Sequence, residues 1–140
     1  MRIIATGITF ICLLIGLAKG QGVEQKAIEV GQYIKIAKCK NGQPEFVSMD
    51  VYARTKPYNK SKIDTLTGDG LLDAFFNDKS IDAKRLPCSM GGYKYKIAAL
   101  HEFEEKGTTK RVMILYTAYP LTLIWVELDK AIELGELDFN

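Results

Sequence analysis

The fold class of this chain is set by residues 93–128, which read YKYKIAALHEFEEKGTTKRVMILYTAYPLTLIWVEL. Residues 93–104 alternate in polarity, as a strand with one buried face does. The stripe predicted to be buried consists of Tyr93, Tyr95, Ile97, Ala99, His101 and Phe103. Lys106-Gly107 can turn the chain, residues 111–119 are almost continuously apolar, and residues 121–128 form another apolar run. Three successive strands are therefore expected, with the middle one covered on both faces.

Upstream of this region, the sequence predicts a β-hairpin. Val30–Lys40 and Gln43–Arg54 are strand-like segments separated by Asn41-Gly42, the dipeptide preferred in two-residue type I′ turns. Such a turn would set Ile36 opposite Val47, so that the apolar residues of both strands share one face.

Two short helices are predicted among the strands. The first carries one apolar stripe, made of Leu71, Leu72, Phe75 and Phe76. Thr67 or Asp69 is its expected N-terminal cap. The second spans residues 130–134, with Asp129 as its cap and Gly135 where a left-handed residue ends a helix.

Together these elements predict an α+β fold with the order ββ-α-βββ-α. We expect a mostly antiparallel sheet of about five strands, packed with one or two short helices. Residues 21–140 contain no linker, repeat or low-complexity segment, so they are predicted to form a single α+β domain.

Residues 1–20 have the features of a secretory signal peptide. Met1-Arg2 supplies a short positive region, residues 3–18 are almost entirely apolar, and Ala18-Lys19-Gly20 ends in small residues. We expect cleavage before Gln21 and a secreted or periplasmic protein with no stable membrane span. An uncleaved anchor is the alternative, but about 16 apolar residues are short against the roughly 20 that cross a bilayer.

Two cysteines remain after signal cleavage, Cys39 and Cys88. In an oxidising compartment such a pair is most simply one disulfide, which is our prediction. Two buried thiols or a redox-active pair are the alternatives, although the C-x-x-C spacing of a redox motif is lacking.

The charge of the mature chain argues against a nucleic-acid partner. Loss of Arg2 and Lys19 from the 19 basic residues leaves as many bases as the 17 acids. A nucleic-acid binder needs a basic face that neutralises phosphates, and a balanced chain does not suggest one. Residues 21–62 are biased toward Lys and Arg and residues 127–140 toward acids, a pattern typical of solvated faces or of a docking patch.

The sequence nominates no catalytic residue, metal site or cofactor site. His101 is the single histidine and sits in the predicted apolar stripe, where a packing role is favoured over a catalytic one. One histidine and two cysteines expected to be oxidised leave no ligand set for zinc. The aspartates between residues 64 and 78 lack the spacing of a calcium loop.

Tyrosine is the best lead to a function, because this residue is enriched where amphipathic surfaces contact partners. On the predicted hairpin, the candidate contact face consists of Tyr33, Lys35, Tyr52 and Arg54. We therefore expect a small exported binding domain with a protein partner: an accessory, inhibitor or immunity-type protein that is more plausibly not an enzyme. The alternatives are a small secreted hydrolase with His101 as general base and a structural subunit of an envelope or surface assembly.

Overall fold

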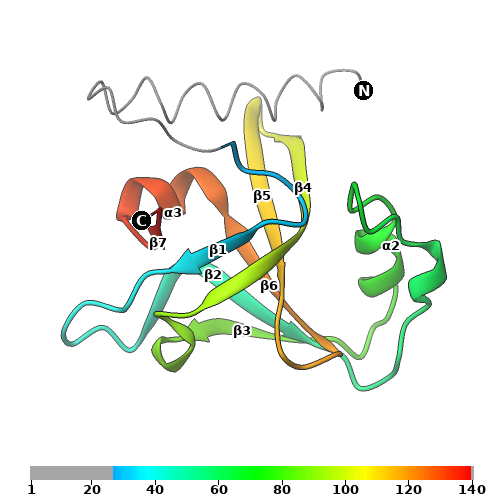
Figure 1. The fold of residues 1–140 in the computed structure, drawn as a ribbon, viewed down its shortest axis with the longest axis horizontal. Coiled ribbons are helices and arrows are strands. Elements are labelled where there is room, and N and C mark those ends of the chain that lie inside the picture. The colour runs from blue at the N-terminus through cyan, green and yellow to red at the C-terminus, as the bar shows by residue number, and fades with distance from the viewer. Residues whose placement is uncertain (1–26, 140) are drawn as a thin grey trace.

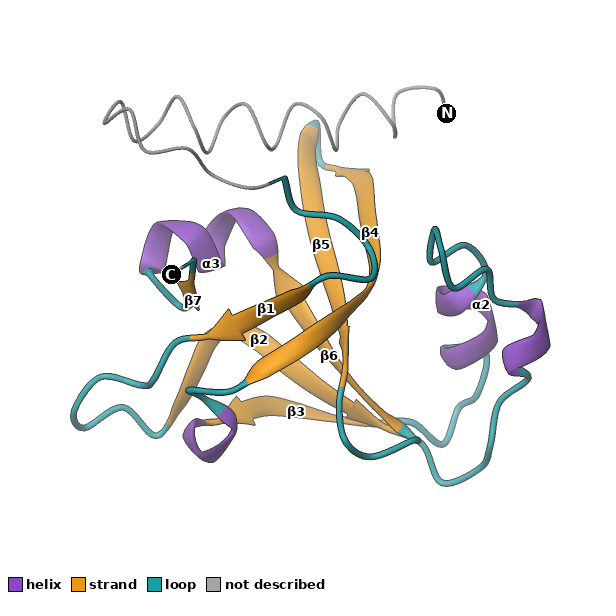
Figure 2. Cartoon of the chain, in the orientation of Figure 1, coloured by secondary structure: helices purple, strands orange, loops and turns teal. Residues whose placement is uncertain are grey.

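The computed structural model describes residues 27–139 of the chain. The predicted signal peptide, residues 1–20, and the expected mature start at Gln21 lie outside the described residues. Within that range, seven strands, two short α-helices and two 3-10 helices follow one another (Figures 1 and 2). Their bounds are β1 Tyr33–Ile36, β2 Glu45–Ala53, η1 Lys60–Lys62, α2 Leu71–Phe75, β3 Asp82–Pro87, η2 Cys88–Met90, β4 Lys94–Glu105, β5 Thr108–Tyr116, β6 Thr122–Glu127, α3 Leu128–Leu134 and β7 Leu137–Asp138.

The strands form one antiparallel sheet in the order β3-β2-β6-β5-β4-β1-β7, curved into a half-barrel (Figure 1). The prediction of a mostly antiparallel sheet with two short helices is confirmed. The predicted strand count of about five is too low, because the edge strands β3 and β7 were not expected as strands. β3 is mostly exposed and β7 has two residues, so neither carries a clear apolar alternation.

The predicted hairpin between residues 30–40 and 43–54 is wrong. β1 pairs with β4 and β7, whereas β2 pairs with β3 and β6. A turn does form, since the N–H of Gln43 donates to the carbonyl of Lys40, but only Gly42 of its two central residues has a positive φ, 80°. That pattern belongs to type II turns, which splay the flanking strands instead of pairing them.

The type I′ geometry occurs instead between β4 and β5. Lys106 and Gly107 both have positive φ, 52° and 79°, and Glu105 pairs with Thr108 across the turn. The predicted turn at this position is confirmed. The two strands that this turn joins, β4 and β5, form the longest pairing in the sheet. They lie in the middle of the half-barrel.

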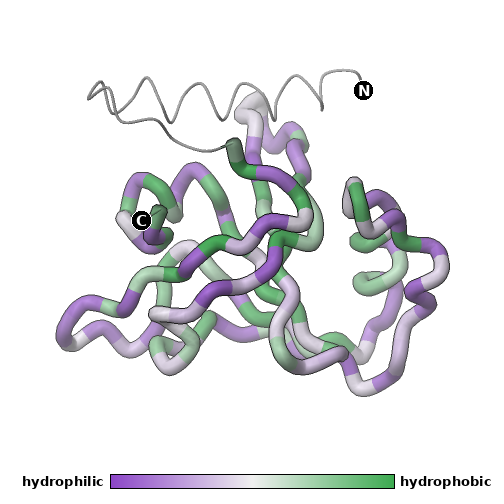
Figure 3. The backbone as a smooth tube through the Cα atoms, in the orientation of Figure 1, coloured by the Kyte–Doolittle hydropathy of each residue, from purple (hydrophilic) through white to green (hydrophobic). Residues whose placement is uncertain are grey.

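Each face of the sheet carries its own hydrophobic cluster. One cluster includes Ile36, Met113 and Leu128 and is covered by α3; the other includes Phe75, Ala99 and Ile114 and is covered by α2. Figure 1 shows the two helices on opposite sides of the central strands. In Figure 3 the hydrophobic residues concentrate in these strands, whereas the loop after β1 is hydrophilic.

A β-bulge in β4 breaks the predicted alternation of residues 93–104. The register shifts between Ile97 and Ala99, so that Ile97 and Leu100 join one cluster while Ala98 and Ala99 join the other. The predicted single stripe of odd-numbered residues is therefore wrong, because a bulge reverses the faces that follow it.

Both helices form, but not with the predicted N-terminal caps. α2 begins after Gly70, whose φ is 87° and which offers no side-chain cap, so neither Thr67 nor Asp69 caps it. A Cβ at Gly70 would lie 2.3 Å from the carbonyl oxygen of Lys62, so the chain approaches too closely for another residue. α3 begins at Leu128, before the predicted cap Asp129, and ends at the predicted Gly135 with φ 70°.

The two edges of the half-barrel are tied together. The predicted disulfide Cys39–Cys88 is confirmed, with a Cα–Cα distance of 5.6 Å. It links the chain after β1 to the end of the opposite edge strand, β3. No helix within residues 27–139 is long and apolar enough to cross a bilayer.

Candidate interaction site

Two adjoining pockets form the main concave surface around β4. The first has a volume of about 350 Å³ and lies between the loop of residues 58–65 and the end of β5. The second, of about 620 Å³, lies between β1, η2 and the start of β4. They share four lining residues, Lys96, Tyr116, Thr117 and Tyr119. Because of this shared wall, we treat them as one site, the tyrosine groove.

Six of the seven tyrosines of the chain line the tyrosine groove. They are Tyr33, Tyr58, Tyr93, Tyr95, Tyr116 and Tyr119. They come from β1, from the loop before η1, from β4 and the residue before it, and from β5 and the loop after it. The fold thus gathers on one surface residues that are as far as 86 positions apart in the sequence.

Backbone pairing and local hydrogen bonds hold these tyrosines in place. Tyr33 pairs with Lys96 across β1 and β4, and the hydroxyl of Tyr95 donates to the carbonyl of Met90 at 2.6 Å. The N–H of Tyr119 donates to Oγ1 of Thr117 at 3.0 Å, which fixes the loop between β5 and β6. The groove is therefore largely preformed, which lowers the entropy cost of binding.

The six tyrosines divide into exposed and half-buried rings. Tyr33, Tyr93 and Tyr119 are 66%, 63% and 67% exposed. Tyr58, Tyr95 and Tyr116 are half-buried, and this burial raises the pKa of each phenol above its usual value. These three phenols stay neutral at physiological pH. Tyr58 and Tyr116 pack against the cluster that α2 covers, whereas Tyr95 packs against the cluster that α3 covers. Tyr58 and Tyr116 therefore form the base of the first pocket, and Tyr95 lines the second from the other face of the sheet.

The charge of the tyrosine groove is entirely positive. Lys60, Lys94 and Lys96 line it, and no Asp or Glu of residues 27–139 does. Nζ of Lys60 lies 5.5 Å from the centre of the Tyr58 ring. Within the part of the chain that the structure describes, none of the three ammonium groups forms a salt bridge. Three uncompensated cations beside aromatic rings suit an anionic ligand.

The four residues predicted as a contact face do not form one face, because β1 and β2 are not neighbours in the sheet. Tyr33 does line the tyrosine groove. Lys35 lies on β1 next to it and pairs with Asp138 at 3.7 Å. Tyr52 lies on β2, in a separate aromatic pocket beside α2.

Arg54, the fourth of these residues, is 9% exposed and organises the end of α2. Nη1 donates to the carbonyl of Phe75, and Nε donates to the carbonyl of Lys56 at 2.8 Å. Nη2 lies 3.4 Å from the carboxylate of Asp78. These contacts leave little of the guanidinium for a partner.

His101 lies on β4 opposite Val112, and it lines neither pocket of the tyrosine groove. Its Nε2 is buried and has no hydrogen-bond partner within residues 27–139. Burial lowers the pKa of His101, while the charges of Asp69 and Asp73 act to raise it. The same described residues contain no group of three metal-ligating side chains.

Comparison with known proteins gives no guide to function: no known family, curated protein or solved structure significantly matches this chain. The function must therefore be inferred from the chemistry of the surface. Sequence reasoning had counted the tyrosines but assigned most of them to no site. The nearest signal in the sequence is the segment Tyr93-Lys94-Tyr95-Lys96, but successive residues of a strand point to opposite faces, so this alternation alone does not predict one site.

Proposed function

We propose that this chain is a small exported interaction domain that binds an acidic segment of a partner protein in the tyrosine groove. The observation that carries this proposal is the composition of the groove: six of seven tyrosines and three lysines, with no acid among the described lining residues.

Tyrosine supports a role in protein binding for a physical reason. Its ring buries a large area, its hydroxyl can hydrogen-bond, and its two side-chain torsions lose little entropy on binding. Binding hot spots are accordingly enriched in tyrosine and lie in preformed pockets. Tyr93 and Tyr119, exposed at the rim on ordered backbone, fit that description.

The three lysines indicate the charge of the partner. An acidic segment would neutralise Lys60, Lys94 and Lys96 and would be steered toward the groove before contact. The groove runs past the ends of two strands, a shape suited to an extended segment. The association should therefore weaken as salt is raised, because exposed charges are screened over about 8 Å at physiological ionic strength.

Two features support an extracellular or periplasmic setting for this function. The N-terminal segment has the pattern of a signal peptide, and the Cys39–Cys88 disulfide is of the kind that persists in oxidising compartments. An accessory, inhibitor or immunity-type role would place the partner in the same compartment.

Capture from the exported fraction of the native host tests the proposal. The bait is residues 21–140, compared with a Tyr93→Ala/Tyr119→Ala variant and a Val47→Ala/Phe103→Ala control. The control removes two exposed apolar side chains that line neither pocket of the groove. We expect the tyrosine variant to capture at least about tenfold less partner protein than the wild type, because truncation of hot-spot residues weakens binding by that much. Equal capture by the tyrosine variant and the wild type would contradict the proposal.

A Lys60→Gln/Lys94→Gln/Lys96→Gln variant tests the charge of the partner. Its capture should be weak at low salt and nearly independent of salt, whereas wild-type capture should fall as salt rises. A Lys56→Gln/Lys79→Gln/Lys84→Gln variant removes the same charge outside the groove and serves as control. If the control variant loses as much capture as the groove variant, the binding surface lies elsewhere.

A further inference from the structure

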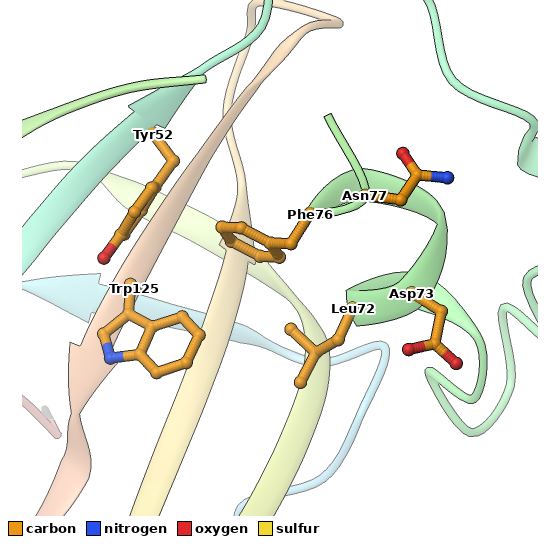
Figure 4. A pocket seen from close by; sticks show the side chains of 6 residues that line it. All are labelled: Tyr52, Leu72, Asp73, Phe76, Asn77 and Trp125. Carbon is orange, nitrogen blue, oxygen red and sulfur yellow. The ribbon is translucent and has the colours of Figure 1, made fainter. Parts of the chain in front are cut away.

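A third pocket lies between α2 and the sheet, separate from the two pockets of the tyrosine groove. Its volume is about 450 Å³, and it is lined by Tyr52, Leu72, Asp73, Phe76, Asn77 and Trp125 (Figure 4). Tyr52 on β2 lies diagonally across from Trp125 on β6, because Tyr52 pairs with Leu123. Leu72 of α2 and Phe76 after it form the opposite wall. We call this site the aromatic pocket.

The three rings of the aromatic pocket stand at steep angles to one another. The Tyr52 and Phe76 planes meet at 82°, the Phe76 and Trp125 planes at 86°, and the Tyr52 and Trp125 planes at 56°. Their centroids are 5.1 to 5.9 Å apart. Figure 4 shows the rings and Leu72 around one open space. These distances and angles are those of edge-to-face contacts, so the rings touch one another, and a ligand would lie against their outer surface and Leu72.

These rings pack on the outside of the cluster that α2 covers. α2 already contributes Leu71 and Phe75 to the core, both fully buried. Tyr52, Phe76 and Trp125 are only partly buried and pack at the border of that cluster. Three partly exposed aromatic side chains thus meet at one concave place, and a few convergent side chains in a pocket are what small-molecule sites offer.

The charge of the aromatic pocket is opposite to that of the tyrosine groove. Its described lining contains one carboxylate, Asp73, and no Lys or Arg. Asp73 forms no hydrogen bond or salt bridge with another described residue, and Figure 4 places it at the rim beyond Leu72. Two arginines of the adjoining segments are paired with carboxylates, Arg54 with Asp78 at 3.4 Å and Arg85 with Asp50 at 3.3 Å. The pocket therefore favours a cation.

We propose that the aromatic pocket binds a compact organic cation with a trimethylammonium group, such as choline. Such a group has an apolar surface and a delocalised positive charge, so it is attracted to ring faces and loses little hydration on entry. Tryptophan is the strongest partner for this interaction, and Trp125 is a partly exposed ring of the pocket. The trimethylammonium group can come from free choline or from the headgroup of phosphatidylcholine.

The test uses Trp125, the one tryptophan of the chain, as its own reporter. Folded mature protein is titrated with choline, with tetramethylammonium and with 3,3-dimethylbutan-1-ol, the neutral isostere of choline, while tryptophan emission is recorded. We expect a saturable change with both cations and at least about tenfold weaker binding of the isostere, because the ring faces attract charge. Equal binding of choline and its isostere, or no saturable change with either cation, would overturn the proposal.

Variants separate the rings from the general shape of the pocket. Phe76→Leu and Tyr52→Leu keep apolar bulk but remove a ring face, and each should weaken choline binding about three- to tenfold. Tyr52→Phe keeps the ring and should bind as the wild type does. Tyr119→Leu, in the tyrosine groove, is the matched control. Melting curves exclude variants that unfold, and choline affinity unchanged in both leucine variants would contradict a role for the rings.

Vesicles distinguish the two sources of the ligand. Mature protein is sedimented with vesicles of phosphatidylcholine and, in parallel, of phosphatidylglycerol, which lacks the trimethylammonium group. Co-sedimentation with phosphatidylcholine and not with phosphatidylglycerol, weakened by Phe76→Leu to the same degree as choline binding, would assign the pocket to the lipid headgroup. Choline binding without such co-sedimentation would assign it to the free cation.

Discussion

The carboxylate of Glu136 accepts hydrogen bonds from both the N–H and the hydroxyl of Ser48, which lies 88 positions earlier in the chain. The same carboxylate accepts from the N–H of Val47 at 3.0 Å and from Nε2 of Gln43 at 3.3 Å. Glu136 directly precedes β7, so these bonds join one edge of the sheet to the first half of β2. Together with the disulfide, this buried side chain closes the half-barrel.

The hydrogen bonds that Glu136 accepts predict a loss of stability in acid. Burial acts to raise the pKa of Glu136, but the hydrogen bonds from Ser48, Val47 and Gln43 outweigh it and lower the pKa below its usual value. The stabilisation is therefore complete above the pKa of the unfolded chain, near 4.3, and is lost as pH falls through the lower folded value. Glu136→Gln should lower the free energy of unfolding at pH 7 by roughly 1.5 to 3 kcal/mol. Urea unfolding from pH 7 to pH 3 measures this, and the difference between wild type and variant should shrink toward pH 3; a constant difference would contradict the assignment.

Arg54→Leu should be among the most destabilising single substitutions in the domain. It would leave the buried carbonyl of Phe75 without its donor and free the end of α2, at a cost of about 3 to 5 kcal/mol. Arg85→Leu is the control: Arg85 pairs with Asp50 on the surface, and its loss should change stability by less than about 1 kcal/mol. Chemical denaturation compares them, and similar effects of both would contradict the structural role of Arg54.

Removal of the disulfide should destabilise the domain without changing its fold. The bond closes a separation of 49 residues, and Cys39→Ser/Cys88→Ser should cost about 2 to 5 kcal/mol. Unfolding of the wild type with and without reductant should show the same difference, while the double variant should be insensitive to reductant. Recovery of both cysteines as free thiols from exported protein would contradict the bond.

His101→Gln separates a packing role from a catalytic one. If His101 is a packing residue, the substitution should lower the free energy of unfolding by about 0.5 to 3 kcal/mol and leave partner capture intact. If His101 is a general base, the substitution should leave the free energy of unfolding unchanged and lower turnover by about 10² to 10⁴-fold. Melting curves beside a panel of ester, glycoside and peptide substrates measure both. Wild-type turnover that is abolished at unchanged melting temperature would refute the binding-domain proposal in favour of the hydrolase.

The strands from β4 to β6 could be predicted from sequence because their apolar patterns and turns are local. The pairing of β1 could not be predicted, because its apolar pattern fits pairing with any apolar strand. The sequence suggests a hairpin with β2 at Asn41-Gly42, but the true partner of β1 lies about 60 residues away in β4. The bulge after Ile97 is equally invisible, since the residues on either side of it are all apolar.

The candidate sites were predictable only in part. The sequence indicates tyrosine as the informative residue type, but of the predicted contact face of Tyr33, Lys35, Tyr52 and Arg54 only Tyr33 lines the groove. Tyr33 and Tyr119 line the same pocket because of the order of the strands, which no local pattern reveals. Likewise, Tyr52 and Trp125 become neighbours only because β2 pairs with β6.

The central claim is that partners bind in the tyrosine groove, and site-specific photocrosslinking in the native host tests it most directly. A photoreactive phenylalanine analogue is placed at Tyr93, in the groove, or at Phe103, which is exposed but lines neither pocket of the groove. We expect one discrete crosslinked protein from position 93, reduced by the Lys60→Gln/Lys94→Gln/Lys96→Gln background, and none from position 103. A crosslink to the same protein from position 103 but not from position 93 would contradict the claim.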